Sequence, residues 1–214
     1  MPLNCQHLKY IILIMALLLC GIGKILGQTA QRYALDFDGT NDRGRLLPDG
    51  AFNHQPITYA FWFNIPSGGG GHVMGNGHNA SKHGYGGVFI NETQAFFAWT
   101  TSDVNPVGRD RFFQANGLSI STDTWHHFAA VMDFSGQSGT LYLDGEPLSA
   151  SINATATDWT PETSAITTDY FGAREVNSIL YFNGTLDEIS VWSTALSATE
   201  IRDYMFRSID SNHP

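Results

Sequence analysis

The sequence predicts an all-β protein, an antiparallel two-sheet sandwich of the jelly-roll type that ends in one short C-terminal helix. Two observations predict this class. Short runs of alternating apolar and polar residues, separated by Gly, Asn, Asp and Pro, fill most of the chain. Helical periodicity is nearly absent before Ser197. Because no helices separate the strands, a βαβ arrangement is disfavoured and a sandwich is expected.

The chain has 214 residues, which suffices for one large β domain or two small ones. Neither an internal repeat nor a linker interrupts the pattern after the first 30 residues. We therefore expect a single domain over residues 31–214, of a size that one hydrophobic core can stabilise.

Residues 1–30 are predicted to be a signal peptide. A lysine precedes the apolar run 11–19, which has the length of a signal-peptide core and is too short to span a bilayer. Gly27 and Ala30 are small residues after which cleavage is expected. An uncleaved anchor and a lipoprotein acylated at Cys20 are the alternatives. The sequence thus predicts a secreted protein, extracellular or at a cell surface, with a bacterial envelope as the expected setting.

Composition excludes several functions. Both cysteines, Cys5 and Cys20, lie in the predicted signal peptide, so the exported domain has no disulfide, no thiol nucleophile and no thiolate metal site. The net charge is −9, and the sequence has no basic cluster. Nucleic acid and an anionic membrane surface are therefore not expected as partners. Membrane insertion is not expected once the signal peptide is removed.

Alternation and turn residues place the strands. Residues 33–37 and 58–65 alternate, while 125–132 is apolar on both faces, as in a central strand. Asp144 and Gly145 predict a tight turn, and segment 67–87, with its four consecutive glycines, is predicted to be a long loop. The predicted strands are 33–37, 58–65, 88–90, 95–99, 125–132, 140–143, 170–172 and 181–192.

The apolar face changes sides within the last predicted strand. Leu186 and Ile189 have opposite parity, which predicts a bulge or bend near Gly184. Asp187 then falls on the same side as Ile189 and is expected to face the core. A buried carboxylate needs a cation or several hydrogen-bond donors, because an unpaired buried charge is very costly.

A short helix is predicted after this strand. Ser197 and Glu200 have the spacing of a capping box, in which each side chain binds the backbone N–H of the other residue. Leu196 and Ile201 stand where a hydrophobic staple places its two apolar residues.

Six segments, taken in order, resemble the laminin-G-like, concanavalin A-like jelly-roll family. They are residues 34–42, 58–63, 124–133, 140–146, 182–192 and 195–201. The resemblance implies a concanavalin A-like two-sheet fold in which the first and last strands are neighbours. It implies little about activity, because such folds occur in lectins, adhesion modules, enzyme appendages and glycanases.

The resemblance also implies a structural calcium ion. In this sequence its ligands would be Asp187 of the closing motif, with Asp38 and Gly39 of the opening turn. Calcium accepts backbone carbonyls, so few carboxylates are needed. The alternative is that Asp38 forms an Asx turn and Asp187 accepts backbone N–H groups.

Four residues in or next to predicted loops are candidate ligand contacts: His78, Tyr85, Trp99 and Arg174. Aromatic rings stack on sugar faces, and arginine hydrogen-bonds hydroxyl or carboxylate groups. For Trp99 the alternative is burial in the core, which is usual for a tryptophan at the end of an apolar strand.

The histidines give weaker signals. His72, His78 and His83 could hold zinc, although a solvated glycine-rich loop is the simpler interpretation. His126 and His127 alternate in a strand, so one ring should face a core and form a hydrogen bond. Neither has an obvious serine or carboxylate partner in the sequence.

Glycanases of this fold carry a Glu-x-Asp-x-x-Glu strand motif, and this chain has none. Asp187 and Glu188 are adjacent, so in a regular strand they point to opposite faces and cannot flank one glycosidic bond. The sequence therefore predicts a non-enzymatic binding domain that recognises carbohydrate. A protein-binding adhesion module and a divergent hydrolase are the alternatives, and the expected partner is a glycan or an extracellular protein.

Overall fold

The computed structural model describes residues 34–46, 57–77, 87–100, 110–152, 159, 168–176 and 178–207. Within this part the chain is all-β apart from one short helix, and the paired strands are antiparallel, as predicted. The elements are β1 (Leu35–Asp38), β2 (Gly44–Leu46), β3 (Ile57–Asn64), β4 (Gly70–Gly77), β5 (Gly87–Asn91), β6 (Gln94–Thr100), β7 (Asp110–Asn116), β8 (His126–Asp133), β9 (Ser138–Leu143), β10 (Glu146–Pro147), β11 (Ser151–Ile152), β12 (Thr168–Phe171), β13 (Ala173–Val176), β14 (Ser178–Trp192) and α2 (Ala198–Tyr204).

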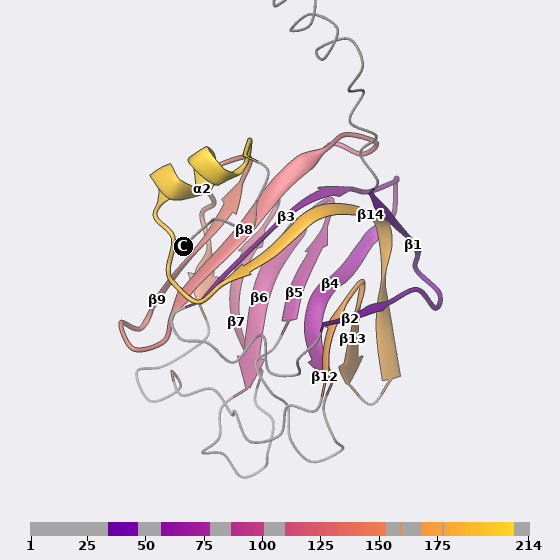
Figure 1. Ribbon diagram of the computed structural model, residues 1–214, viewed down its shortest axis with the longest axis horizontal. Coiled ribbons are helices and arrows are strands. Elements are labelled where there is room, and N and C mark those ends of the chain that lie inside the picture. The colour runs from indigo at the N-terminus through magenta and orange to yellow at the C-terminus, as the bar shows by residue number, and fades with distance from the viewer. Residues whose placement is uncertain are drawn as a thin grey trace, which may run out of the picture. The chain divides into compact units, whose positions relative to one another are not determined.

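One curled sheet forms both layers of the fold (Figure 1). Its main order is β10-β9-β8-β3-β14-β4-β5-β6-β7-β11. We call the part formed by β10, β9, β8 and β3 the first layer and the part formed by β4, β5, β6, β7 and β11 the second layer. Strand β14 joins the layers, because residues 185–192 pair with β3 while Phe182 and Asn183 pair with β4. Strand β1 also pairs with β14, so the first and last strands are neighbours, as the family resemblance implies.

The glycine-rich segment 67–87, predicted as one loop, contains strand β4. Its glycines permit close backbone contact rather than a loop. A Cβ at Gly70 would lie 2.4 Å from the carbonyl oxygen of Ile90, and one at Gly71 would lie 2.4 Å from that of Tyr181. Only a residue without a side chain fits between two neighbouring strands at that distance. Strand β7 was also not predicted from the sequence.

The irregularity predicted in the last strand is present at a different position. Pairing between β14 and β3 shifts register between Asp187 and Ser190, and Glu188 has a left-handed backbone with φ +48°. Pairing with β1 is continuous through Gly184, so no bulge lies there. Gly184 is required for another reason, since a Cβ would lie 2.5 Å from the Asn64 carbonyl oxygen.

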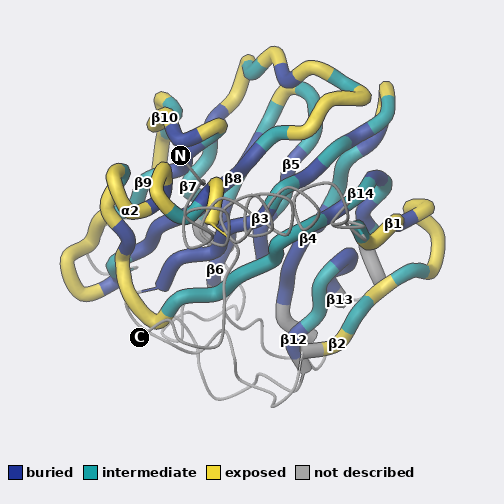
Figure 2. Tube along the Cα trace, turned by 45° about the horizontal axis from the view of Figure 1, so that its top comes forward, coloured by how far each residue is buried: buried dark blue, intermediate teal, exposed yellow. Residues whose placement is uncertain are grey.

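The main hydrophobic core lies between the two layers. Figure 2 shows buried residues concentrated on the central strands, with exposed residues in turns and on the helix. Burying each large apolar side chain contributes about 1.5–3 kcal/mol. The largest fully buried side chains are Trp99, Phe61, Phe63, Phe97, Phe128, Phe134, Phe182, Ile57, Ile65 and Met74.

A second, smaller core lies between α2 and the outer face of the β3–β8 layer. Its buried members are Ala60, Ala129, Val131, Tyr142, Leu196 and Ile201. The predicted staple pair, Leu196 and Ile201, therefore lies in one cluster. The predicted capping box is confirmed as well, because Ser197 N donates to Glu200 Oε2 at 2.8 Å and Glu200 N donates to Ser197 Oγ at 3.3 Å.

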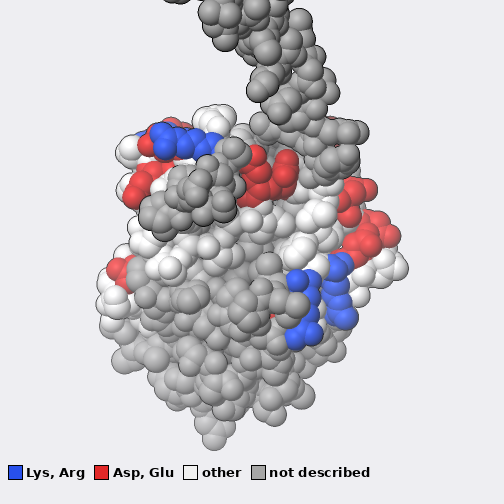
Figure 3. Space-filling view, viewed as in Figure 1, with Lys and Arg blue, Asp and Glu red and all other residues white. Residues whose placement is uncertain are grey.

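Acidic side chains are more widespread than basic ones on the surface seen in Figure 3, as the acidic composition leads one to expect. On the face seen in Figure 3, acidic side chains occupy several separate areas. Basic side chains form two small groups there, one of them near α2. The described part of this face has no extended basic surface of the kind that binds nucleic acid.

The predicted signal peptide, residues 1–30, lies outside the described residues. Among the described residues no helix has the length and hydropathy needed to cross a membrane.

Candidate ligand-binding face

The strand register aligns five side chains across the outer face of the second layer. His72 pairs with Phe89, Phe89 with Phe96, Phe96 with Gln114, and Gln114 with Ser151. Directly opposed residues of antiparallel strands share a face, so these side chains form one row across β4, β5, β6, β7 and β11. At about 4.8 Å per strand, the row is about 19 Å long. We call it the cross-strand row.

The rings of this row pack on one another. Phe89 and Phe96 stack with centroids 4.8 Å apart and planes 3° apart. His72 meets Phe89 edge-on at 5.2 Å, and Phe112 of β7 meets Phe96 edge-on at 5.3 Å. All three phenylalanines are partly exposed, and none belongs to either hydrophobic core. Clustered apolar rings with remaining exposure are typical of a binding surface.

Arg174 of β13 lies against the same face. A Cβ at Gly75 would lie 2.8 Å from Arg174 Cγ, and one at Gly87 would lie 3.4 Å from Arg174 Cδ. Gly75 of β4 and Gly87 of β5 are directly opposed. Because neither has a side chain, the Arg174 side chain can lie against the sheet at this point. The structure thus brings Arg174, a predicted ligand contact, beside the row. Its exposed fraction is 6%.

His72 forms the end of the row next to Arg174. Its side chain is buried, and Nδ1 has no hydrogen-bond partner in the described structure. Burial, and secondarily the positive charge of Arg174, lower the pKa of His72 from 6.5 to about 4. The ring is therefore neutral at pH 7 and has an unused polar atom beside the phenylalanines. Nδ1 itself is buried, so it is not an exposed ligand contact.

A family model described as the concanavalin A-like lectin/glucanases superfamily matches residues 38–202. The chain belongs to this superfamily. The resemblance found in the sequence is therefore confirmed. A search of curated proteins finds no match to the sequence.

Solved structures show the same fold at low sequence identity. A Ruminococcus gnavus sialidase CBM40 bound to α2,3-sialyllactose superposes with a TM-score of 0.58 and 13% identity, over 80% of this chain and 97% of that one. A leech intramolecular trans-sialidase gives 0.63 and 17%, over 85% and 28%. Mouse laminin α1 domains LG4-5 give 0.53 and 14%, over 77% and 46%. These likenesses confirm the predicted jelly-roll fold.

Trp99, another predicted ligand contact, does not join Arg174. Trp99 is fully buried among Phe97, Phe134 and Trp159, at centroid distances of 6.2, 5.5 and 5.4 Å. Its ring presents no face to a sugar, in agreement with the alternative that it belongs to the core. The remaining two predicted contacts, His78 and Tyr85, lie outside the described residues, as does the zinc candidate His83. Within the described chain, no group of three His, Cys, Asp or Glu side chains could hold a metal ion.

The predicted calcium ligands are separated by the register. Asp38 pairs with Asn183, whereas Asp187 lies four residues further along β14. Four residues of extended strand span about 13 Å. Asp38 and Asp187 therefore do not lie side by side, and one ion cannot bind both in this arrangement. Gly39, with φ +77°, lies against Asn183 at the Asp38 end.

Each aspartate also accepts local hydrogen bonds. Asp38 Oδ1 accepts the backbone N–H of Thr40 at 2.7 Å and of Asn41 at 3.4 Å, an Asx turn. Asp187 Oδ1 accepts the N–H of Glu188 at 2.8 Å. These are the interactions that the alternative interpretation predicts, and the calcium ion stays a prediction.

The predicted orientation of Asp187 is wrong. Asp187 pairs with Trp62, and Ser190 pairs with Ala60, so both lie on the outer face of the layer. Val191 pairs with the core residue Tyr59 and faces the opposite way. The one extra residue of the bulge changes the parity, which alternation alone does not reveal.

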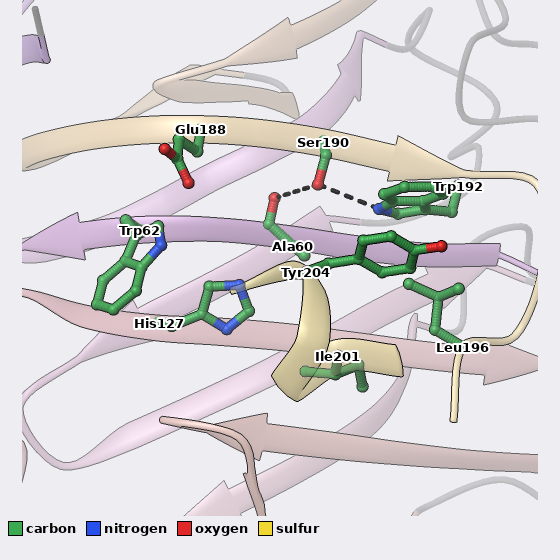
Figure 4. Close-up of a pocket in the computed structure, with 9 residues that line it drawn as sticks. All are labelled: Ala60, Trp62, His127, Glu188, Ser190, Trp192, Leu196, Ile201 and Tyr204. Atoms are coloured by element: carbon green, nitrogen blue, oxygen red, sulfur yellow. Dashed lines mark hydrogen bonds between the residues drawn. The ribbon is translucent and has the colours of Figure 1, made fainter. Parts of the chain in front are cut away.

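The outer face of the first layer contains a small cavity beneath α2 (Figure 4). Its walls include Trp62, His127, Glu188, Trp192 and Tyr204. The volume is about 20 Å³, which is enough for one water molecule and too small for a sugar. His127 is buried here, its Nδ1 has no partner in the described structure, and burial lowers its pKa from 6.5 to about 4. One histidine of the adjacent pair is therefore buried, as predicted, but the hydrogen bond expected of the buried ring is not found at its Nδ1 among the described residues.

Proposed function

We propose that this is a secreted domain that binds carbohydrate along the cross-strand row without cleaving it. The observation that carries the proposal is the partly exposed set of three phenylalanine rings, Phe89, Phe96 and Phe112, on a sheet face outside both hydrophobic cores. Aromatic faces stack against the apolar faces of sugar rings, and shallow platforms of this kind bind weakly but selectively.

The polar ends of the row complete a sugar-binding surface. His72 at one end is buried, with an Nδ1 that has no hydrogen-bond partner among the described residues. Gln114, next to Ser151 at the other end, has an amide that both donates and accepts hydrogen bonds. Arg174 adds a positive charge beside His72. A row of about 19 Å would contact several consecutive sugar units rather than one. A Ruminococcus gnavus carbohydrate-binding module of this fold, described with bound sialyllactose, supports the ligand class.

The row contains no carboxylate, and this supports recognition without cleavage. Glycosidases place two carboxyl groups about 5–9.5 Å apart across the scissile bond. The five side chains that form the row are His72, Phe89, Phe96, Gln114 and Ser151.

A protein-binding adhesion module is the second candidate. It is favoured by exposed apolar side chains away from the row, because Phe206 is 79% exposed and Trp125 is 41% exposed. Exposed aromatic residues are common anchors in protein interfaces.

A glycan array, followed by titration with the oligosaccharides that bind, tests these candidates on the full chain. We expect Phe96→Ala to weaken binding at least tenfold, the equivalent of about 1.4 kcal/mol. The matched control is Phe206→Ala, which removes an exposed ring outside the row and should leave affinity unchanged. Binding to a purified matrix or surface protein with no glycan bound would favour adhesion, and cleavage of a polysaccharide would favour a hydrolase.

We also propose that a calcium ion stabilises the region where the first and last strands meet. Ligand binding to the folded state alone raises stability by about 2.7 kcal/mol at a hundredfold excess over Kd. The melting temperature should rise with calcium and fall with chelator. Because Asp38 and Asp187 are about 13 Å apart along the strand, Asp187→Asn and Asp38→Asn should not both remove the response. A melting curve of metal-free protein that ignores calcium contradicts the proposal.

Secretion is proposed from the apolar run near the N-terminus, and intact-mass analysis of the exported protein tests it. The expected mass is that of a chain beginning within residues 28–31. A mass that retains Met1, or a lipid on Cys20, would contradict cleavage of a simple signal peptide.

A further inference from the structure

His126 has two partners that its place in the sequence does not suggest. Its Nε2 lies 2.8 Å from Ser121 Oγ, and its Nδ1 lies 2.8 Å from Asp144 Oδ2. The serine is five residues upstream and the aspartate 18 residues downstream. The expectation that His126 lacks a serine or carboxylate partner is therefore wrong. The hydrogen-bonded chain runs from serine to histidine to aspartate.

Asp144 is fixed by interactions separate from the one with His126. Its Oδ1 accepts the backbone N–H of His127 at 2.8 Å, and its own N–H donates to the His127 carbonyl at 2.8 Å. The residue begins the tight turn with Gly145 in a left-handed conformation, φ +51°. The His126 ring also packs on Phe63, with centroids 5.8 Å apart. The base and its carboxylate are therefore held in one geometry.

Ser121 lies in the segment that leads into β8, and this segment is fastened on both sides of the serine. Ile120 N donates to the Glu92 carbonyl at 2.9 Å, and Asp123 N donates to the Ile65 carbonyl at 2.9 Å. Ser121 itself is exposed. Its hydroxyl is therefore accessible to a reagent in solution while its distance to His126 is maintained.

We propose that Ser121 is an acyl-accepting nucleophile, with His126 as its general base and Asp144 as the group that orients the base. An Nδ1–H donating to Asp144 leaves the Nε2 lone pair to accept the Ser121 hydroxyl proton. Nucleophile, base and orienting carboxylate are recognised by this geometry rather than by sequence order. The substrate class is a small, unhindered acyl ester. The site involves none of the residues of the cross-strand row, so it does not depend on the proposed function.

The reaction balances without a cofactor. Ser121 Oγ bonds to the ester carbonyl carbon, and its proton passes to His126 Nε2. The bond from carbon to the leaving oxygen then breaks, and that oxygen takes the proton from Nε2. Water hydrolyses the acyl-serine by the same route, giving its proton to Nε2 and restoring the Ser121 hydroxyl.

The expected reactivity is modest. A positioned general base contributes about 10²–10⁴-fold. The Asp144 side chain is 47% exposed, and solvent weakens its electrostatic effect on the imidazole. We therefore expect acylation of Ser121 followed by slow turnover, rather than efficient catalysis.

The test treats the full chain with p-nitrophenyl acetate and locates acetyl groups by peptide mass mapping over time. Ser135 is the internal control, because it is exposed and donates to Asp133 Oδ1 at 2.8 Å, and among the described residues it has no hydrogen bond to a histidine. We expect Ser121 to be acetylated at least about 100-fold faster than Ser135. His126→Gln should lower the Ser121 rate about 100-fold without changing the Ser135 rate.

Asp144→Asn should lower the Ser121 rate as well, and its melting curve shows whether the altered turn still folds. If it does not fold, the His126→Gln variant carries the test. Ser121→Ala then serves as the blank, because no acetyl group can form at position 121. Equal acetylation of Ser121 and Ser135 in the unmodified protein would overturn the proposal. So would a Ser121 rate that His126→Gln leaves unchanged in a folded protein.

Discussion

The outer faces of the two layers both contain a buried histidine, but they differ in what packs over the sheet. Each contains a buried histidine, His127 on β8 and His72 on β4, whose Nδ1 has no partner among the described residues and whose pKa burial lowers to about 4. Helix α2 covers the first face and forms a second core there. On the second face, the described residues present stacked, partly exposed rings. The same kind of buried histidine therefore lies under a helix on one face and beside partly exposed aromatic rings on the other.

This difference shows that an apolar outer strand face has two uses. Where the chain supplies a cover, as Leu196 and Ile201 do for β3 and β8, the face stabilises the fold. Where aromatic residues keep some exposure, as Phe89 and Phe96 do, we propose that the face binds a ligand. The predictions below distinguish the two faces. Substitutions on the face covered by α2 should change stability, whereas substitutions in the cross-strand row should change glycan affinity.

The largest expected effect is on the covered face. Ile201→Ala should lower the free energy of unfolding by about 2–5 kcal/mol, because Ile201 is 1% exposed and its loss leaves a cavity under α2. Denaturant titration measures this change. Glycan affinity of the folded variant should be unaffected, and a parallel loss of affinity would show that the two faces are coupled.

Acid should destabilise both faces through the histidines. For His72 and His127 the folded pKa, about 4, lies below the unfolded value of 6.5. Protonation therefore favours unfolding, so this stability is complete above pH 6.5 and is lost as the pH falls toward 4. Each shift corresponds to an upper limit of roughly 3 kcal/mol.

Unfolding free energies at pH 7 and pH 4.5 measure this dependence. His127→Gln and His72→Gln should each reduce the difference between the two pH values, since the side chain no longer titrates. A pH dependence identical to that of the unmodified protein would exclude the histidine concerned as its source.

A smaller effect is expected at the beginning of the helix. Ser197→Ala removes the hydroxyl that accepts the Glu200 N–H at 3.3 Å and should lower stability by about 1 kcal/mol. Ser193→Ala, an exposed serine before the helix, serves as a control for loss of a hydroxyl alone. Equal effects of the two substitutions would argue against a capping contribution.

The smallest effect is expected at the polar end of the cross-strand row. Gln114→Ala removes one hydrogen-bonding group, worth about 0.5–1.5 kcal/mol, so glycan affinity should fall by about two- to tenfold. Stability should hardly change, because Gln114 is partly exposed. Isothermal titration with the best array ligand checks this, and unchanged affinity would place the ligand elsewhere on the row.

The sequence by itself determined the fold class, most strands and the end of the chain. These depend on local rules: alternation specifies a strand, and Ser197 with Glu200 specifies a helix start. Core burial of Trp99 is one of the two interpretations that the sequence allows, and the structure confirms it. The family resemblance implies the pairing of the first and last strands, which is present. The glycine-rich strand β4 was missed, because glycine favours loops in isolation and is needed here for close strand contact.

Part of the candidate site also has a sequence signal. Phe96 and Phe97 are adjacent, as are Phe112 and Phe113, so each pair places one ring outside the core. An outward phenylalanine on a strand is a sign of a covered or binding face. Arg174 was identified because it follows a strand end, although the reason for its position, the pair Gly75 and Gly87, is not visible in the sequence.

Only the tertiary structure decided which residues meet. The cross-strand row joins positions 72, 89, 96, 114 and 151, and the Ser121–His126–Asp144 chain joins three others, through a register that local patterns do not fix. The bulge in β14 likewise moved Asp187 to the outer face, away from the core side that alternation predicts. A strand pattern specifies which side chains share a face, but a shift of one residue in pairing reverses that face. Contacts between distant strands therefore depend on the register of the whole sheet.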